Sequence, residues 1–380
     1  MIYKRAWAEI NLQNLCHNLK IVQSQLSPDH TGLMGIVKAD AYGHGAVAVA
    51  HTLEKHGVKN LGVALCEEAI ELRNSGMSLP ILVMGFTPKE LVHKVLELKL
   101  TQTIFSKTGA DFTAKEAAKS NEQVSVHIKI DTGMSRLGFL PTEKSVMEIC
   151  EIARNPYINI TGIYTHFATS DAIDNQFMHE QLKRFTWVVN QLTARGVHIP
   201  LKHISNSGAF SHITTGEKYK DFNLDMVRIG IMLYGYPPSV EMGDICKPLG
   251  LKPAMRLISR ISMVKELEAN VGISYGHIYK TKRKSKIAVL PIGYADGYPR
   301  QLSKTGKVII NGQFAPIAGA ICMDQCMVDI TDIEGEVKPY DEVIMMGEPG
   351  ICADNLAETI GTISYEILCG IGKRVPRVYV

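Results

Sequence analysis

The sequence predicts an α/β protein in two parts: an N-terminal (β/α)8 TIM barrel over residues 1–240 and a C-terminal mostly-β domain over residues 241–380. The first observation behind this fold class is that short apolar runs alternate with amphipathic helical stretches through the first two-thirds of the chain, as in successive strand–helix units. The second is that β-rich segments separated by turns replace this alternation near residue 240. The first few residues are also candidates for pairing with the second domain.

Eight apolar runs are the expected strands of the barrel. They occupy residues 33–38, 60–65, 80–85, 101–106, 124–131, 159–166, 202–206 and 226–233. Strand–helix units in this number favour a closed parallel barrel over an open sheet. Polar residues end several of these runs, which supports the same fold because the carboxyl ends of barrel strands carry the chemistry.

Turn and cap signals place three further features. Thr87 stands directly before Pro88, so we predict a helix with Thr87 as its N-cap and proline at the first helical position. In the second domain, Asn311 and Gly312 lie between two apolar runs and predict a β-hairpin. A short helix is expected around residues 353–361.

Composition and charge exclude several classes of protein. The 380 residues are 46% hydrophobic and 21% charged, with a formal net charge of +3, which is ordinary for a globular protein. The densest basic run, KTKRKSK at 280–286, has no interleaved aromatic residues, so nucleic acid is not an expected partner.

The 8 cysteines show no zinc-ligand spacing, so we expect free thiols in a reducing cytoplasm and no metal site. No signal peptide or long apolar span is recognised, so we expect a cytoplasmic protein that does not enter the membrane.

Lys38 is the first candidate for catalysis. It ends the apolar run GIVK, where burial of an unpaired ammonium is costly. Lys38 is therefore either a surface lysine that extends to solvent or a desolvated amine that can form a Schiff base with an aldehyde. Gly43 and Gly45 would let the backbone approach a ligand closely. His166 and Asn206 also end predicted strands and would share the rim with Lys38.

A phosphate site is suggested by SNSG at 205–208 and RIGI at 228–231. These segments belong to the predicted seventh and eighth strands, whose loops often bind phosphate in barrels. The alternative is an ordinary turn and a packing glycine. A Schiff-base lysine together with a phosphate cradle suggests pyridoxal phosphate. If Arg228 faces the pyridine nitrogen of this cofactor, the nitrogen stays unprotonated and the ring is a weaker electron sink.

The chain resembles the alanine racemases of the fold-type III pyridoxal-phosphate family over essentially its full length. The motifs that carry the resemblance are GIVKADAYGHG, HIKIDTGMSRLGF, GIYTHFATSD, HISNSGAF, MVRIGIMLYG, ISYGHIY, PIGYADGYPR, GAICMDQCMVDIT and SYEILCGIGKRVPR, in this order. The resemblance implies interconversion of L-alanine and D-alanine, with D-alanine supplied to peptidoglycan. It also implies a homodimer with shared active sites.

The family implies a role for each matching residue. Lys38 holds the cofactor and acts as one base, and Tyr275 of the partner subunit is the second base. His166 links Arg228 to this tyrosine. The other positions, by role, are cofactor binding by Tyr42, Asn206, Ser207, Gly230, Ile231 and Tyr365, substrate-carboxylate binding by Arg136 and the partner's Met323, carbamylation of Lys129, and an entrance lined by Asp171 and Tyr294.

Two bases are needed because a single base on one face of the α-carbon tends to retain configuration. Without the resemblance, Tyr275 would be interpreted as a sheet aromatic, His166 as a satisfied core histidine and Arg136 as a surface ion-pair partner. Asp131 and Asp324 are expected to be structural.

The rival functions are a racemase that also accepts serine, a decarboxylase of the same fold and a non-catalytic pyridoxal-phosphate-binding protein. Decarboxylases of this fold typically place a glutamate where this chain has Arg228, and a single-domain binding protein would lack the second domain.

Overall fold

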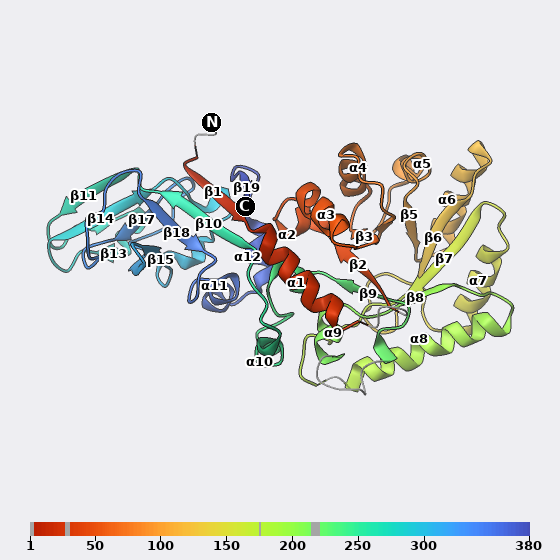
Figure 1. The fold of residues 1–380 in the computed structure, drawn as a ribbon. Coiled ribbons are helices and arrows are strands. Elements are labelled where there is room, and N and C mark those ends of the chain that lie inside the picture. The colour runs from red at the N-terminus through yellow and green to blue at the C-terminus, as the bar shows by residue number, and fades with distance from the viewer. Residues whose placement is uncertain (1–3, 27–30, 175, 214–220) are drawn as a thin grey trace.

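The structure is a computed structural model that describes residues 4–26, 31–174, 176–213 and 221–380. Figure 1 shows two bodies side by side: a barrel wrapped by helices, and a β-rich body that contains both β1 and the end of the chain. One cluster of buried apolar side chains extends through both bodies. No helix in the described part of the chain is long and apolar enough to cross a membrane.

The barrel contains all eight predicted strands. They are β2 (Gly32–Ile36), β3 (Asn60–Val63), β4 (Ile81–Val83), β5 (Thr101–Ile104), β6 (Val124–Lys129), β7 (Ile158–Tyr164), β8 (Leu201–His203) and β9 (Met226–Ile229). Their spatial order is β8-β7-β6-β5-β4-β3-β2-β9, and each pair in this order is parallel. The sheet closes because the amides of Asp225 and Arg228 donate to the carbonyls of Lys202 and Ser205, over 3.1 and 3.0 Å. The predicted fold class is confirmed.

Helices cover the outside of the barrel (Figure 1). They are α1 (Leu12–Ser24), α3 (Ala46–Lys55), α4 (Cys66–Asn74), α5 (Val92–Glu97), α6 (Lys107–Ser120), α7 (Glu143–Ala153), α8 (Gln176–Ala194) and α9 (Ser207–Ile213). Several of them begin at a residue whose side chain caps the free backbone amides. The hydroxyl of Ser106, for example, accepts from the amide of Gly109 at the N-terminus of α6. The prediction for Thr87 is wrong, because a 3-10 turn (Lys89–Leu91) follows Pro88. The Thr87 hydroxyl donates instead to Gln102 Oε1 over 2.7 Å in a buried position.

The second body is built on a six-stranded sheet with the order β16-β15-β18-β10-β1-β19. Its strands are β16 (Gln313–Pro316), β15 (Lys307–Ile310), β18 (Glu342–Met346), β10 (Met255–Arg260), β1 (Ala6–Ile10) and β19 (Arg377–Tyr379). β1 runs antiparallel to β10 and parallel to β19, so the two ends of the chain meet in this sheet. The predicted hairpin joins β15 to β16, where Asn311 and Gly312 both have positive φ.

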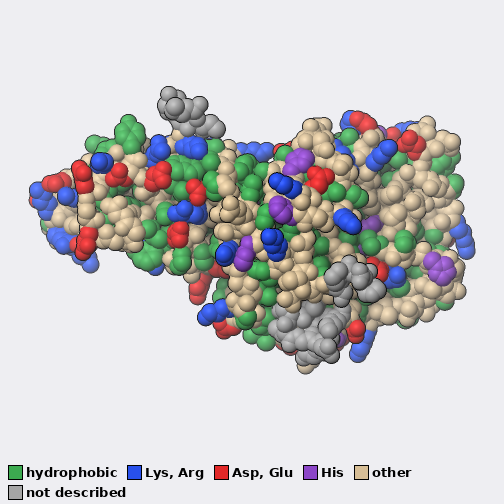
Figure 2. Space-filling view, viewed as in Figure 1, with side chains coloured by type: hydrophobic (Ala, Val, Ile, Leu, Met, Phe, Trp, Pro, Cys, Tyr) green, Lys and Arg blue, Asp and Glu red, His purple; other side chains and the backbone are tan. Residues whose placement is uncertain are grey.

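Smaller elements complete this body. A three-stranded sheet contains β11 (Met263–Leu267), β14 (Ser285–Leu290) and β17 (Cys326–Asp329), and β12 (Gly272–Ile273) pairs with β13 (Tyr279–Lys280). The expected short helix is present as α11 (Ala353–Ile360), and α12 (Ser364–Gly370) follows it. On the face shown in Figure 2, Lys and Arg side chains are interspersed with Asp and Glu side chains.

Candidate active site

A cavity of about 420 Å³ opens at the carboxyl ends of the barrel strands. Most of the site residues predicted from the sequence line it. They are Lys38, Tyr42, Lys129, Arg136, His166, Asp171, Asn206, Ser207, Arg228, Gly230, Ile231 and Tyr365. The fold therefore brings Tyr365, on a helix of the second body, to the same cavity as Lys38 of the barrel, although the two lie more than three hundred positions apart in the chain.

Three predicted residues do not reach this cavity within one chain. Tyr275 begins the short 3-10 turn η5 (Tyr275–His277) of the second body, and its side chain is 72% exposed. Met323 is 53% exposed and lines the same open hollow as Tyr275. Tyr294, which is 41% exposed, lies next to the Met323 loop, because its amide donates to the carbonyl of Cys322 over 3.1 Å. A single chain thus carries these three residues on a surface apart from its own cavity.

Lys38 begins a left-handed turn, α2 (Lys38–Tyr42). Residues 39–42 have φ between 51° and 53°, although none is glycine. Such a conformation costs roughly 1–2 kcal/mol per residue and is found where the surrounding structure enforces it. Glu68 of α4 supplies that support, because its carboxylate accepts from the amides of Ala39 and Ala64 over 2.6 and 2.7 Å. Burial and the nearby Arg136 charge lower the pKa of Lys38, which favours the nucleophilic neutral amine.

The side chains of Tyr42, Ser207 and Tyr365 form a cradle of hydroxyl groups in the wall of the cavity. A Cβ atom at Gly230 would lie 2.4 Å from the Tyr42 hydroxyl, so only glycine leaves this space open. The Ser207 hydroxyl accepts from the Gly230 amide over 3.0 Å. The ring of Tyr365 lies 5.8 Å from that of Tyr42. Three hydroxyl groups and the start of the 3-10 turn η3 (Ile231–Tyr234) therefore converge on one small space, as a phosphate group requires.

Arg228 on β9 is buried beneath the cavity, and both of its terminal nitrogens, Nη1 and Nη2, contact fixed groups of the protein. Nη1 donates to His203 Nδ1 over 2.9 Å, and Nη2 donates to the carbonyls of Thr165 and Ile204 over 2.8 and 2.9 Å. Nη2 also lies 3.3 Å from His166 Nδ1. Burial lowers the pKa of Arg228 to about 10, so the side chain remains charged at neutral pH.

The contacts of Arg228 fix the tautomers of the neighbouring histidines. Because arginine only donates, His203 Nδ1 must accept, and its Nε2–H is then directed to His127 Nδ1, 3.0 Å away. By the same reasoning His166 carries its proton on Nε2. Burial, with the charge of Arg228, lowers the pKa of His166 and His203 well below the ordinary value and that of His127 to about 4. The positive charge of this group therefore resides on Arg228.

Lys129 ends β6 on the wall of the cavity. Burial first, and then the charges of Arg136 and Arg228, lower its pKa to about 8. Its Nζ lies 5.6 Å from the centre of the Tyr164 ring. Asp131 nearby has a structural role, because its carboxylate accepts from the amides of three following residues, Gly133, Ser135 and Arg136.

Asn206 lies on the cavity wall, but its side-chain oxygen is occupied within the chain. It accepts from the Ser170 hydroxyl over 2.9 Å and from the Ala209 amide over 3.0 Å. The second bond caps the start of α9, the helix that carries Ser207. The contacts of Asn206 thus orient the neighbouring part of the cradle.

Comparison with known proteins identifies the family. The model of the alanine racemase N-terminal domain matches residues 10–238, and that of the alanine racemase C-terminal domain matches residues 254–379. The chain belongs to the alanine racemase family. Alanine racemase 1 of Clostridium acetobutylicum is 45% identical over 377 residues, which are 98% of this chain and 95% of the relative. The family resemblance seen in the sequence is confirmed.

Solved structures agree with this family at the level of the whole fold. The alanine racemase of Clostridium difficile 630 superposes with a TM-score of 0.95 at 45% identity, covering 100% of this chain and 97% of that one. The alanine racemase of Bartonella henselae, solved with covalently bound pyridoxal phosphate, gives a TM-score of 0.86 at 29% identity and covers 99% of both chains. In the present chain, the cradle at Gly230 fits the phosphate group of this cofactor, and the neutral amine favoured at Lys38 fits its aldehyde.

Three residues that surround the cavity, His127, Tyr164 and His203, were not predicted from the sequence as site residues. His127 and Tyr164 each lie two positions before a predicted site residue, Lys129 and His166. Side chains alternate along a strand, so residues two apart share a face. This spacing was the available signal. The third, His203, lies in the quoted segment HISNSG, within β8 itself.

Proposed function

We propose that the protein is an alanine racemase that interconverts L-alanine and D-alanine with pyridoxal phosphate as its cofactor. One observation carries this proposal: Lys38, Arg228 and the glycine cradle at Gly230 line a single cavity at the carboxyl rim of the barrel. A free amine, a fixed cation and a space for phosphate are the three features that the cofactor needs.

Lys38 would hold the cofactor covalently through its side-chain amine. The hydroxyls of Tyr42, Ser207 and Tyr365, with the backbone at Gly230 and Ile231, would hold the phosphate, and Asn206 would support this cradle. Arg228 would face the pyridine nitrogen and, being charged at neutral pH, would leave that nitrogen unprotonated. When bound there, pyridoxal phosphate supplies an electron sink for negative charge at the α-carbon of an amino acid.

The two bases would come from two subunits. Lys38 would move the α-proton on one face of the substrate, and Tyr275 of the partner subunit would move it on the other. His166 carries its proton on Nε2, directed away from Arg228, and can donate to the phenolic oxygen. This hydrogen bond would hold the phenolic oxygen of Tyr275 in place to act as a base. Activity would therefore require a homodimer with shared active sites.

The remaining predicted residues would bind and admit the substrate. Arg136 on the cavity wall would contact the substrate carboxylate, together with the backbone amide of Met323 of the partner subunit. A carbamylated Lys129 would be an anion next to Arg136 and would hold it in place. Asp171 and the partner's Tyr294 would line the entrance.

We further propose a cytoplasmic enzyme that supplies D-alanine for peptidoglycan, without a nucleic-acid or membrane partner. A racemase that also accepts serine remains a second candidate, since a small pocket discriminates weakly against an added hydroxyl. A non-catalytic binding protein is disfavoured by the second body, with Tyr275 exposed on it.

The direct test is to incubate the purified protein and pyridoxal phosphate with L-alanine, L-serine and L-lysine in D₂O. The proposal predicts loss of optical rotation and deuterium at the α-carbon of alanine, with slower turnover of serine and none of lysine. Faster turnover of serine would make the protein a serine racemase. Absence of exchange with every amino acid would rule out racemase activity.

A further inference from the structure

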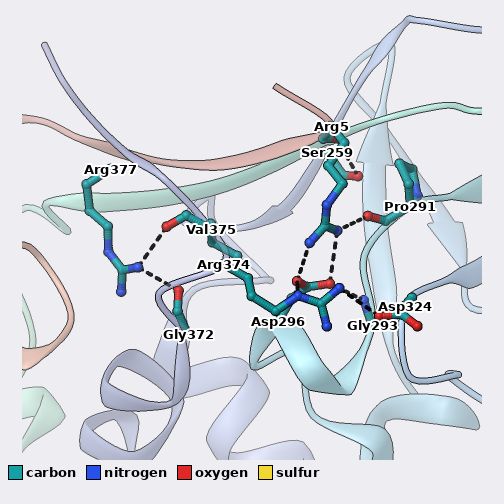
Figure 3. Close-up of polar contacts among 10 residues, drawn as sticks. All are labelled: Arg5, Ser259, Pro291, Gly293, Asp296, Asp324, Gly372, Arg374, Val375 and Arg377. Atoms are coloured by element: carbon teal, nitrogen blue, oxygen red, sulfur yellow. Dashed lines mark hydrogen bonds and ion pairs between the residues drawn. The ribbon is translucent and has the colours of Figure 1, made fainter. Parts of the chain in front are cut away.

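Four charged side chains from distant parts of the sequence meet beside the loop that carries Met323 (Figure 3). Asp296, in the turn η6 (Tyr294–Asp296), is fully buried. The two terminal nitrogens of Arg5 bind its carboxylate: Nη2 donates to Oδ1 over 2.5 Å, and Nη1 donates to Oδ2 over 3.0 Å. Arg374 Nε lies 3.4 Å from the same Oδ1, and its Nη2 donates to Asp324 over 2.7 Å. The Asp296 carboxylate thus joins Arg5, near the start of the chain, to Arg374, near its end, and Arg374 connects this pair to Asp324.

Asp296 also fixes the backbone around it. Its Oδ2 accepts from the Gly293 amide over 3.0 Å, and its backbone carbonyl accepts from the Gly372 amide over 2.9 Å. The segment that presents Arg374 is itself held by Arg377, whose Nη1 donates to the carbonyls of Gly372 and Val375 (Figure 3). Hydrogen bonds therefore hold the backbone on both sides of the ion pair between Asp296 and Arg374.

The turn held by Asp296 binds the Met323 loop directly. The amides of Tyr294 and Ala295 donate to the carbonyls of Cys322 and Met323, over 3.1 and 3.0 Å. A Cβ at Gly293 would lie 2.2 Å from the Cys322 carbonyl, so the two loops pack without space for a side chain. The positions of Met323 and Tyr294 consequently depend on the geometry of this turn.

We propose that Asp296 is a positioning residue, clamped by Arg5 and Arg374, whose task is to hold Tyr294 and Met323 in place for the active site of the neighbouring subunit. This inference rests on the proposed function, which places both residues at the partner's cavity. It also makes Arg5, which precedes the first strand, and Arg374, which lies close to the last strand, positioning residues that act through Asp296.

The charge of Asp296 is what the clamp requires. Burial alone would raise the pKa of this carboxyl, but the bonds from Arg5 and the Gly293 amide outweigh burial and lower it. Asp296→Asn keeps the size of the side chain but replaces one acceptor oxygen by a donor, which faces the guanidinium groups with the wrong polarity. We expect the turn to shift, and a misplacement of about 1 Å at a site can cost on the order of a hundredfold in rate.

The test uses heterodimers purified through two different affinity tags on co-expressed chains. The Asp296→Asn homodimer should lose at least about tenfold in kcat/KM, while the absorbance of the lysine-bound cofactor stays unchanged, because the barrel is intact. In a heterodimer with a Lys38→Ala chain, one barrel retains Lys38 and receives an unaltered second body. That heterodimer should recover about half of the wild-type activity, since one of two sites is complete.

A matched heterodimer of Lys38→Ala with Tyr275→Phe separates this inference from the proposed function. If this pair fails to recover activity, the shared site itself is wrong. If it recovers while the Lys38→Ala and Asp296→Asn pair remains as slow as the Asp296→Asn homodimer, Asp296 acts within its own chain and our inference is overturned. Wild-type kcat/KM in the Asp296→Asn homodimer would overturn it as well.

Hydrogen exchange gives a readout that does not depend on activity. In Asp296→Asn, the amides of Tyr294 and Ala295 should exchange faster, while amides of the barrel strands keep their protection. Unchanged exchange at these two amides would contradict the clamp. If Asp296→Asn does not fold, Arg374→Gln carries the same measurements, because it removes the contacts to Asp296 and Asp324 from a half-exposed position.

Discussion

The guanidinium of Arg228 lies 3.3 Å from Nδ1 of His166, and this contact fixes which nitrogen of the histidine carries the proton. Arginine cannot accept a hydrogen bond, so Nδ1 accepts and Nε2 donates. His166 therefore presents an N–H rather than a lone pair to the cavity that it lines. A phenol that approached it would be stabilised in its deprotonated form, which is the form that a tyrosine base needs.

Arg228→Lys should impair both stability and turnover. An ammonium cannot serve the carbonyls of Thr165 and Ile204 together with two histidines, so buried acceptors lose their partners at about 1–3 kcal/mol each. We expect urea unfolding to show a loss of about 2 kcal/mol and kcat/KM to fall by at least about tenfold. Arg73→Lys is the control, because Arg73 also donates to backbone carbonyls, here those of Leu98, Met77 and Leu79, but lies outside the cavity. It should lose stability and keep kcat/KM; equal kinetic losses in both variants would contradict the assignment.

Glu68→Ala should loosen the left-handed turn that follows Lys38. The amides of Ala39 and Ala64 lose their acceptor, and the strained residues 39–42 are then free to relax. We expect pyridoxal phosphate to dissociate at least about tenfold faster, as measured by the decay of its absorbance during dilution. Glu67→Ala is the matched control, since Glu67 is exposed on the same helix. Identical dissociation rates in the two variants would show that Glu68 does not support the turn.

Stability should fall on acidification because buried histidines stay neutral in the folded protein. Burial lowers the pKa of His44 and of His127 to about 4, against about 6.5 in an unfolded chain. Between these values the unfolded state binds more protons, so stability is retained above about pH 6.5 and lost as the pH falls toward 4, by up to about 1.4 kcal/mol per pH unit and histidine. Urea midpoints between pH 7 and pH 5 measure this slope, which His127→Asn should reduce. A flat profile would contradict it.

Lys129 should react with carbon dioxide. Its pKa of about 8 leaves a large neutral fraction at mildly alkaline pH, and only the neutral amine forms a carbamate. With ¹³C-bicarbonate, the holoprotein should give a carbamate signal in its NMR spectrum that grows as the pH rises through about 8 and levels off above this value. Lys129→Ala should lack this signal and should bind alanine less tightly. A signal that survives the substitution, or none in the unaltered protein, would remove the modification from the mechanism.

The sequence predicted the architecture because most of the barrel strands are short, largely apolar runs that alternate with amphipathic helices. It predicted the hairpin at Asn311 and Gly312 because this pair adopts positive φ readily. The cap at Thr87 was wrong for a tertiary reason: Gln102, fifteen residues away, offers a buried acceptor that a local rule cannot anticipate.

The site shows the same division between local and tertiary information. Lys38 and His166 could be found at the ends of predicted strands. Glu68 could not be connected to Lys38, because only the fold brings its carboxylate to the amide of Ala39. The role of Asp296 also depends on contacts among segments from both ends of the chain.

The most direct test of the two-base mechanism is α-proton exchange in D₂O by the Tyr275→Phe variant with its cofactor bound. If Tyr275 of one subunit and Lys38 of the other serve opposite faces, the variant should no longer exchange the α-proton of L-alanine for deuterium. It should still exchange the α-proton of D-alanine through Lys38, and the cofactor absorbance should be unchanged. Undiminished conversion of L-alanine to D-alanine by this variant would contradict the mechanism.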